Sequence, residues 1–99
     1  MSLKRLRIHM DARAELLRET LYYETHRVGA GKRFREAVAA AFDLLRRFPA
    51  GGVNGPAGTR KARVKGFPFT VVYRDDPSEI IVFAIAHDRK MPGYWIARR

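Results

Sequence analysis

The sequence predicts an α+β fold in which a helical hairpin packs on a small, mostly antiparallel sheet. Hydrophobic residues recur at helical spacing through much of the first half of the chain. Short runs that alternate or are wholly apolar, separated by turn residues, fill the second half. The expected order of elements is β-α-α-β-β-β. A length of 99 residues suits one domain spanning residues 1–99.

The first strand and helix are expected between residues 3 and 29. Leu6, Ile8 and Met10 share one parity, so a strand is predicted there with these side chains facing the core. Asp11 is the expected N-cap of the helix that follows, and Glu15 lies near its start, where the helix dipole favours an acid. The helix is expected to end at Gly29. Its apolar positions predict a buried face of Ala14, Leu17, Leu21 and Val28.

A second helix is expected from Gly31 to Phe48, where Pro49 follows. Because few residues separate the two helices, they are predicted to pack as an antiparallel hairpin. Residues 49–58 contain four glycines and two prolines and are expected to form an exposed loop. The apolar stripe of the second helix consists of Phe34, Val38, Ala41, Phe42, Leu45 and Phe48.

Three strands are expected in the second half, at residues 59–67, 69–74 and 80–86. The last of them is apolar on both faces, which is typical of a central strand. Residues 75–78 form the turn before it. In the first of the three, Lys61, Arg63 and Lys65 are predicted to share the face opposite Ala62 and Val64.

The charge indicates an anionic partner. Twenty Lys and Arg against ten Asp and Glu give a net charge of +10, which favours a nucleic acid, a ribosome or an acidic protein segment. The chain has no cysteine, and its three histidines fall on different predicted elements, so neither a metal nor a cofactor is expected. No apolar run is long enough to span a membrane, and a cytoplasmic protein is expected.

The candidate site is a basic face of the sheet. Successive side chains of Lys61, Arg63 and Lys65 would lie about 7 Å apart, close to the spacing of phosphates along a nucleic-acid strand. His87, at the end of the central strand, is a candidate acid or base for RNA cleavage, with Arg63, Arg74 or Arg89 stabilising the phosphoryl charge. A hydrogen bond from the backbone to His87 and a core-sealing role for Tyr94 and Trp95 are the structural alternatives. The candidate target-binding residues are Arg60, Lys61, Arg63, Lys65, Lys90 and Trp95.

Several short motifs in order resemble the RelE/ParE toxin superfamily, and most closely the ParE-like plasmid stabilisation toxins. They are Tyr22-Tyr23-Glu24, Phe67-Pro68-Phe69, Val71-Val72-Tyr73-Arg74, the run from Ile81 to His87, and the run from Arg89 to Trp95. The resemblance implies the toxin half of a bacterial type II toxin–antitoxin pair, neutralised by a cognate antitoxin with an acidic or amphipathic segment. The sequence does not decide whether the protein forms a dimer through the helical hairpin.

The resemblance leaves two kinds of activity open. ParE-like members bind DNA gyrase and poison it without chemistry of their own, and the C-terminal sequence from Tyr94 to Arg99 is similar to this branch, which is preferred. RelE-like members are endoribonucleases that cut messenger RNA on the ribosome. A non-toxic basic domain that binds nucleic acid is a third hypothesis. For the nuclease, the resemblance places at the active face Lys61, Arg63, Lys65, Arg74, His87, Arg89 and Tyr94.

Overall fold

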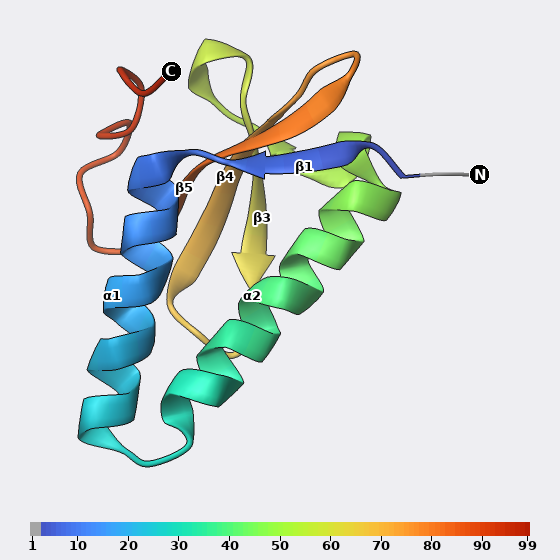
Figure 1. The fold of residues 1–99 in the computed structure, drawn as a ribbon. Coiled ribbons are helices and arrows are strands. Elements are labelled where there is room, and N and C mark those ends of the chain that lie inside the picture. The colour runs from blue at the N-terminus through green and yellow to red at the C-terminus, as the bar shows by residue number, and fades with distance from the viewer. Residues whose placement is uncertain (1–2) are drawn as a thin grey trace.

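The computed structural model describes residues 3–99, with two helices packed on a five-stranded sheet (Figure 1). The strand order is β1-β5-β4-β3-β2, and only β1 runs parallel to its neighbour. The predicted α+β class and helical hairpin are therefore confirmed. The elements are β1 (Arg5–Ile8), α1 (Met10–His26), α2 (Ala30–Arg47), two 3₁₀ turns (Pro49–Gly51 and Pro56–Gly58) flanking β2 (Val53–Asn54), β3 (Arg60–Val64), β4 (Phe69–Asp75) and β5 (Glu79–His87).

The stretch expected to be a loop contributes an extra strand. β2 pairs antiparallel with Arg60 and Lys61 of β3. Two residues are too few to leave a periodic pattern, which explains why the sequence did not indicate this strand. β3 also ends at Val64, short of the predicted Phe67, so Lys65 lies in the turn to β4 rather than in the ladder.

The two helices form a V that is closed at the turn between them and opens toward β1 (Figure 1). Gly31 lies at the closed end, where an added Cβ would come within 2.7 Å of the Thr20 carbonyl oxygen. Only glycine permits this approach. The Glu24 carboxylate accepts hydrogen bonds from the backbone N–H groups of Gly29 and Gly31, which satisfies the start of α2.

The core lies between the helices and the inner face of the sheet. Phe34, Val38, Ala41 and Leu45 of α2 are buried there, as predicted. Phe48, the last member of the predicted stripe, is 61% exposed because α2 ends at Arg47 and the chain turns away. The α2 prediction is therefore right except at its end.

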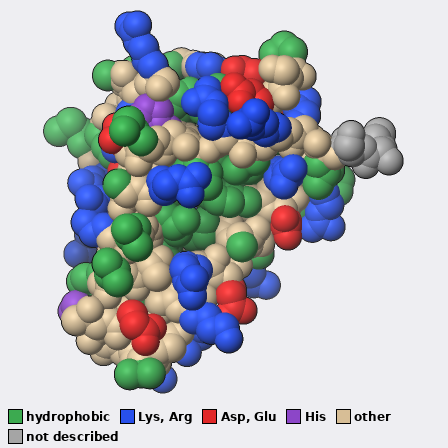
Figure 2. Space-filling view, viewed as in Figure 1, with side chains coloured by type: hydrophobic (Ala, Val, Ile, Leu, Met, Phe, Trp, Pro, Cys, Tyr) green, Lys and Arg blue, Asp and Glu red, His purple; other side chains and the backbone are tan. Residues whose placement is uncertain are grey.

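The buried face of α1 was predicted wrongly. Leu17, Leu21 and Val28 are 61%, 58% and 89% exposed. Figure 2 shows hydrophobic side chains at the surface along α1 and in the opening between the helices. The face that packs inward carries a charged residue among its apolar ones, and it consists of Ala12, Glu15, Leu16 and Tyr23.

The start of α1 also differs from the prediction. His9 is the N-cap, because its Nδ1 accepts a hydrogen bond from the Asp11 N–H at 3.0 Å. The helix therefore begins at Met10, a residue that was predicted to belong to the strand. The Met10 side chain is 77% exposed and does not face the core. Leu6 and Ile8 do pack against the core as expected.

Two substitutions compare how much the buried face of α2 and the exposed face of α1 contribute to stability. Leu45→Ala should lower the free energy of unfolding by about 2–5 kcal/mol, because it leaves a cavity in the core. Leu17→Ala should change it by less than about 0.5 kcal/mol, because the side chain is exposed. Chemical denaturation measures both, and a large loss from Leu17→Ala would contradict the assignment of the α1 faces.

Candidate functional site

A bulge in β5 decides which side chains share a face of the sheet. Val72 pairs with Ala84 and Tyr73 pairs with Val82, so Phe83 is an extra residue with no partner in β4. The bulge shifts the alternation beyond it. His87 therefore pairs with Phe69 on the helix side, where the two rings meet edge to face at 5.0 Å. The basic residues of β3 lie on the opposite side.

The arginines of the predicted basic face are engaged in contacts within the protein. Arg63 forms an ion pair with Asp88 at 2.6 Å and donates to the Thr70 hydroxyl, which lies on the same outer face. Arg74 holds Asp76 through two hydrogen bonds of 2.7 and 3.0 Å. These bonds lower the pKa of the carboxyls of Asp88 and Asp76, so both acids are ionised at neutral pH.

Two further residues predicted to bind a target make contacts within the protein. Arg60 donates to the backbone carbonyls of Ala50 and Gly52 and so holds the segment before β3 in place. Trp95 is 4% exposed and belongs to the apolar cluster that includes Ile81 and Phe83, so its ring is not available to stack on a base. The core-sealing alternative for Trp95 is confirmed. Lys61, Lys65 and Lys90 are exposed.

A buried carboxylate joins α1, β5 and the C-terminal tail. Glu15 is 4% exposed, and its two oxygens accept hydrogen bonds from Arg98 at 2.9 and 3.0 Å. Glu15 also accepts from the Tyr94 hydroxyl at 2.6 Å and from the Ile85 N–H at 3.0 Å. Arg98 donates to the Phe83 carbonyl as well. We call Glu15, Tyr94 and Arg98 the tail clamp.

The clamp fixes the protonation states of its members. Burial by itself would raise the pKa of Glu15, but the hydrogen bonds from Arg98, Tyr94 and Ile85 outweigh it and hold this pKa below its usual value. Burial, together with donation to Glu15, raises the pKa of the Tyr94 phenol well above its usual value. Tyr94 therefore stays protonated and serves as a donor to Glu15.

A cleft of about 610 Å³ lies between α1, the end of β5 and the tail, and we call it the α1–tail cleft. Its lining includes Tyr22, His87 and Tyr94. The His87 Nδ1 accepts a hydrogen bond from the Arg89 N–H at 3.0 Å, which is the backbone contact considered for a strand-end histidine. In the neutral ring this bond leaves the proton on Nε2.

The predicted site residues are thus distributed over two neighbouring places. Arg63 and Lys61 lie on the outer face of the sheet, and His87, Arg89, Lys90 and Tyr94 line the α1–tail cleft. A smaller cleft of about 200 Å³ adjoins both, with Lys61, His87, Lys90 and Tyr94 in its lining. Arg74 stacks on the Phe83 ring at 5.1 Å.

The sequence did not predict the ion pair between Glu15 and Arg98. The sign of it in the sequence was an acidic residue on the same helix face as Ala12 and Leu16.

Comparison with known proteins identifies the family. A family model described as the ParE toxin of the type II toxin–antitoxin system, parDE, matches residues 6–92. The chain belongs to the ParE toxin family. The toxin is also similar in fold to a solved structure of the chromosomal ParDE TA system from P. aeruginosa, with a TM-score of 0.69 and 20% sequence identity. That match covers 86% of this chain and 96% of the other. No curated protein matches the toxin significantly.

Within residues 3–99, no group of three or more His, Asp or Glu side chains is arranged to hold a metal ion. Neither helix of the described chain is long and apolar enough to cross a membrane.

The clamp makes a testable contribution to the stability of the toxin. Glu15→Gln should lower the free energy of unfolding at neutral pH by about 3 kcal/mol, since Arg98 would lose its closest ionic partner in a largely buried place and keep only the more exposed Asp11 at 3.7 Å. Because the folded pKa of Glu15 is lowered, its contribution is fully present above the ordinary carboxyl range and is lost as the pH falls below about 4. Denaturation of both proteins across this pH range measures it.

The control is Glu79→Gln, which breaks the more exposed pair between Arg7 and Glu79. That change should cost at most about 1 kcal/mol. Equal losses from Glu15→Gln and Glu79→Gln would contradict a special role for the clamp.

Proposed function

We propose that this ParE-family toxin arrests bacterial growth by binding DNA gyrase in the cytoplasm, without cutting a nucleic acid itself. The observation that carries the proposal is the bulge at Phe83, which puts His87 on the helix side of the sheet while Lys61 and Arg63 lie on the other side. A phosphodiester held against Arg63 would lie on the outer face, whereas the His87 ring packs on Phe69 on the helix side. An acid–base group must reach the reacting proton directly or through one water.

The other residues of the nuclease hypothesis are also poorly placed for catalysis. Arg74 is five residues along β4 from Phe69, the partner of His87, which corresponds to roughly 16 Å. The Tyr94 hydroxyl is engaged in a hydrogen bond to Glu15. These placements support a toxin that acts by binding over an endoribonuclease.

The surface proposed for the target is formed by the exposed lysines at the edge of the basic face. Lys61 lies on β3, Lys65 follows its end, and Lys90 lies in the segment after β5. Within residues 3–99 none of the three forms an ion pair, whereas Arg63 and Arg74 do. Unpaired cations are available to an acidic patch on a partner, and they speed its association.

We propose that the cognate antitoxin occupies an apolar groove beside the C-terminal end of α2. The groove has a volume of about 450 Å³, and Leu44, Phe48 and Val53 in its lining are 53%, 61% and 72% exposed. β2 pairs with only the first two residues of β3, so the edge of β3 beyond Lys61 has backbone groups available to an added strand. Lys61 and Arg63 also line the groove and favour an acidic segment with apolar anchors.

The gyrase hypothesis predicts different outcomes for two variants. His87→Ala should still arrest growth when the toxin is induced alone. Lys61→Glu with Lys65→Glu should bind gyrase at least about tenfold more weakly and lose the arrest, because like charges would then face the acidic surface. Growth curves, a gyrase binding assay and the level of DNA cleavage complexes measure these effects.

A matched control carries the same change of charge elsewhere. Lys32→Glu with Arg35→Glu alters α2 away from the proposed surface and should retain the arrest. New messenger-RNA 5′ ends inside translated codons that disappear in His87→Ala would contradict the proposal and favour the ribosome-dependent nuclease.

The antitoxin groove is tested separately. Phe48→Asp should abolish rescue of growth by the co-expressed antitoxin and leave toxicity intact, because a carboxylate replaces an apolar anchor in the groove. Val28→Asp places the same charge on the highly exposed turn between the helices and should leave rescue unchanged. Full rescue of Phe48→Asp would show that the antitoxin binds elsewhere.

A further inference from the structure

The α1–tail cleft has the size and lining of a small-molecule site. Its volume of about 610 Å³ falls within the range of ligand pockets, about 300–1,000 Å³. The tail that forms one of its walls is held by the tail clamp, and the Phe69–His87 ring contact contributes to the lining from the sheet. The cleft is therefore built from elements that are fixed by buried contacts.

Aromatic rings line the cleft from several elements. Tyr22 and Tyr23 come from α1, His87 from the end of β5 and Tyr94 from the tail, while Phe69, which contacts the His87 ring, is itself only 1% exposed. Tyr22 is 53% exposed, so its ring is accessible from solvent. Rings distributed around a cleft suit a planar heteroaromatic group, which stacks on them with little demand on sequence or orientation.

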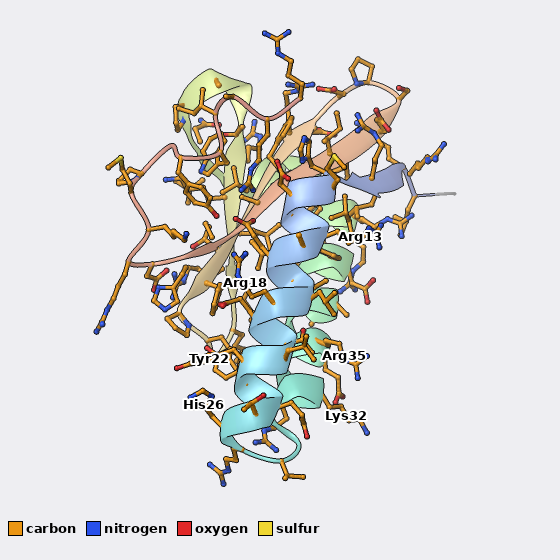
Figure 3. The ribbon with its side chains drawn as sticks, turned by 60° about the vertical axis from the view of Figure 1, so that its left-hand side comes forward. Arg13, Arg18, Tyr22, His26, Lys32 and Arg35 are labelled. Carbon is orange, nitrogen blue, oxygen red and sulfur yellow. The ribbon has the colours of Figure 1, made fainter. Side chains whose placement is uncertain are left out.

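Cations without carboxylate partners also line the cleft. Arg18 on α1, and Arg89 and Lys90 after β5, form no ion pair within residues 3–99, in contrast to Arg63, whose guanidinium is held by Asp88. Figure 3 shows Arg18 and Tyr22 together on the edge of α1 that faces the tail. The His87 Nε2–H adds a donor, because Nδ1 already accepts from the backbone. Clustered donors of this kind bind phosphate.

We propose that the α1–tail cleft binds a nucleoside phosphate, with the base among the aromatic rings and the phosphate against Arg89 and Lys90. Glu19, also in the lining, is an acceptor suited to an amino group of the base. The nucleotide is either free or part of a nucleic-acid strand, since both present the same base and phosphate. This site does not depend on gyrase being the target of the toxin.

The direct test is a titration of the purified, ¹⁵N-labelled toxin with adenosine 5′-monophosphate, followed by amide NMR. Saturable shifts are expected at His87, Arg89 and Lys90. Inorganic phosphate should bind the same residues at least about tenfold more weakly, because it lacks the base. The absence of saturable shifts in the cleft, or equal affinity for phosphate, would overturn the proposal.

Paired variants separate a built site from attraction by net charge. Arg89→Ala with Lys90→Ala should weaken nucleotide binding about tenfold or more. Lys32→Ala with Arg35→Ala removes the same two charges from the other side of the helical hairpin (Figure 3) and should leave the affinity unchanged. Equal weakening by the two double variants would overturn the proposal, because binding would then follow overall charge alone.

The source of the nucleotide is decided by a short single strand of four adenosine nucleotides. Tighter binding than that of the mononucleotide would assign the cleft to a nucleic-acid strand, and equal binding would assign it to a free nucleotide. Both results support the site. A strand that binds without shifting the cleft amides would contradict it. Because these measurements use the toxin alone, their failure leaves the gyrase proposal standing.

Discussion

β1 ends at Ile8, and a last hydrogen bond from the His9 N–H to the Val82 carbonyl closes its pairing with β5. Beyond Val82 the edge of β5 has no strand beside it, yet it is covered by α1 and the tail. Buried backbone groups need partners. Glu15 accepts from the Ile85 N–H and Arg98 donates to the Phe83 carbonyl, so an ion pair replaces the missing strand. The same pair attaches the tail, which carries the buried Trp95 and forms a wall of the α1–tail cleft.

The bulge at Phe83 has an equally wide effect. By adding one residue to β5, it changes the side of the sheet on which every later residue of the strand lies. His87 is thereby separated from the basic residues of β3 and joins the aromatic residues of α1. On the outer face Arg63 and Arg74 are paired with acids, whereas within residues 3–99 the lysines beside them and the cations of the aromatic cleft form no ion pair. The proposal that the toxin acts by binding rests on this distribution.

The sequence was sufficient for the fold class, the family and the face of α2, because a single apolar stripe runs through that helix. It was insufficient for α1, where two faces carry apolar residues and the buried one includes Glu15. The partner of Glu15 is 83 residues away, so local spacing holds no sign of it. The bulge was equally hidden, since residues 80–86 are apolar at every position and a shift of one residue leaves the pattern unchanged. Arg60 and Trp95 were predicted as binding residues from residue type, which does not reveal burial or backbone contacts.

Native-state hydrogen exchange at the Ile85 amide is the most direct test of the claim that Glu15 and Arg98 complete the edge of β5. If the clamp completes the edge of β5, this amide exchanges only when the whole protein unfolds, as slowly as amides bonded within the β4–β5 ladder. In Glu15→Gln the Ile85 amide should exchange much faster, through local opening of the tail. The amides within the β4–β5 ladder should then exchange more slowly than the Ile85 amide. Rapid exchange of Ile85 in the unsubstituted toxin would contradict the claim that Glu15 and Arg98 stand in for a strand.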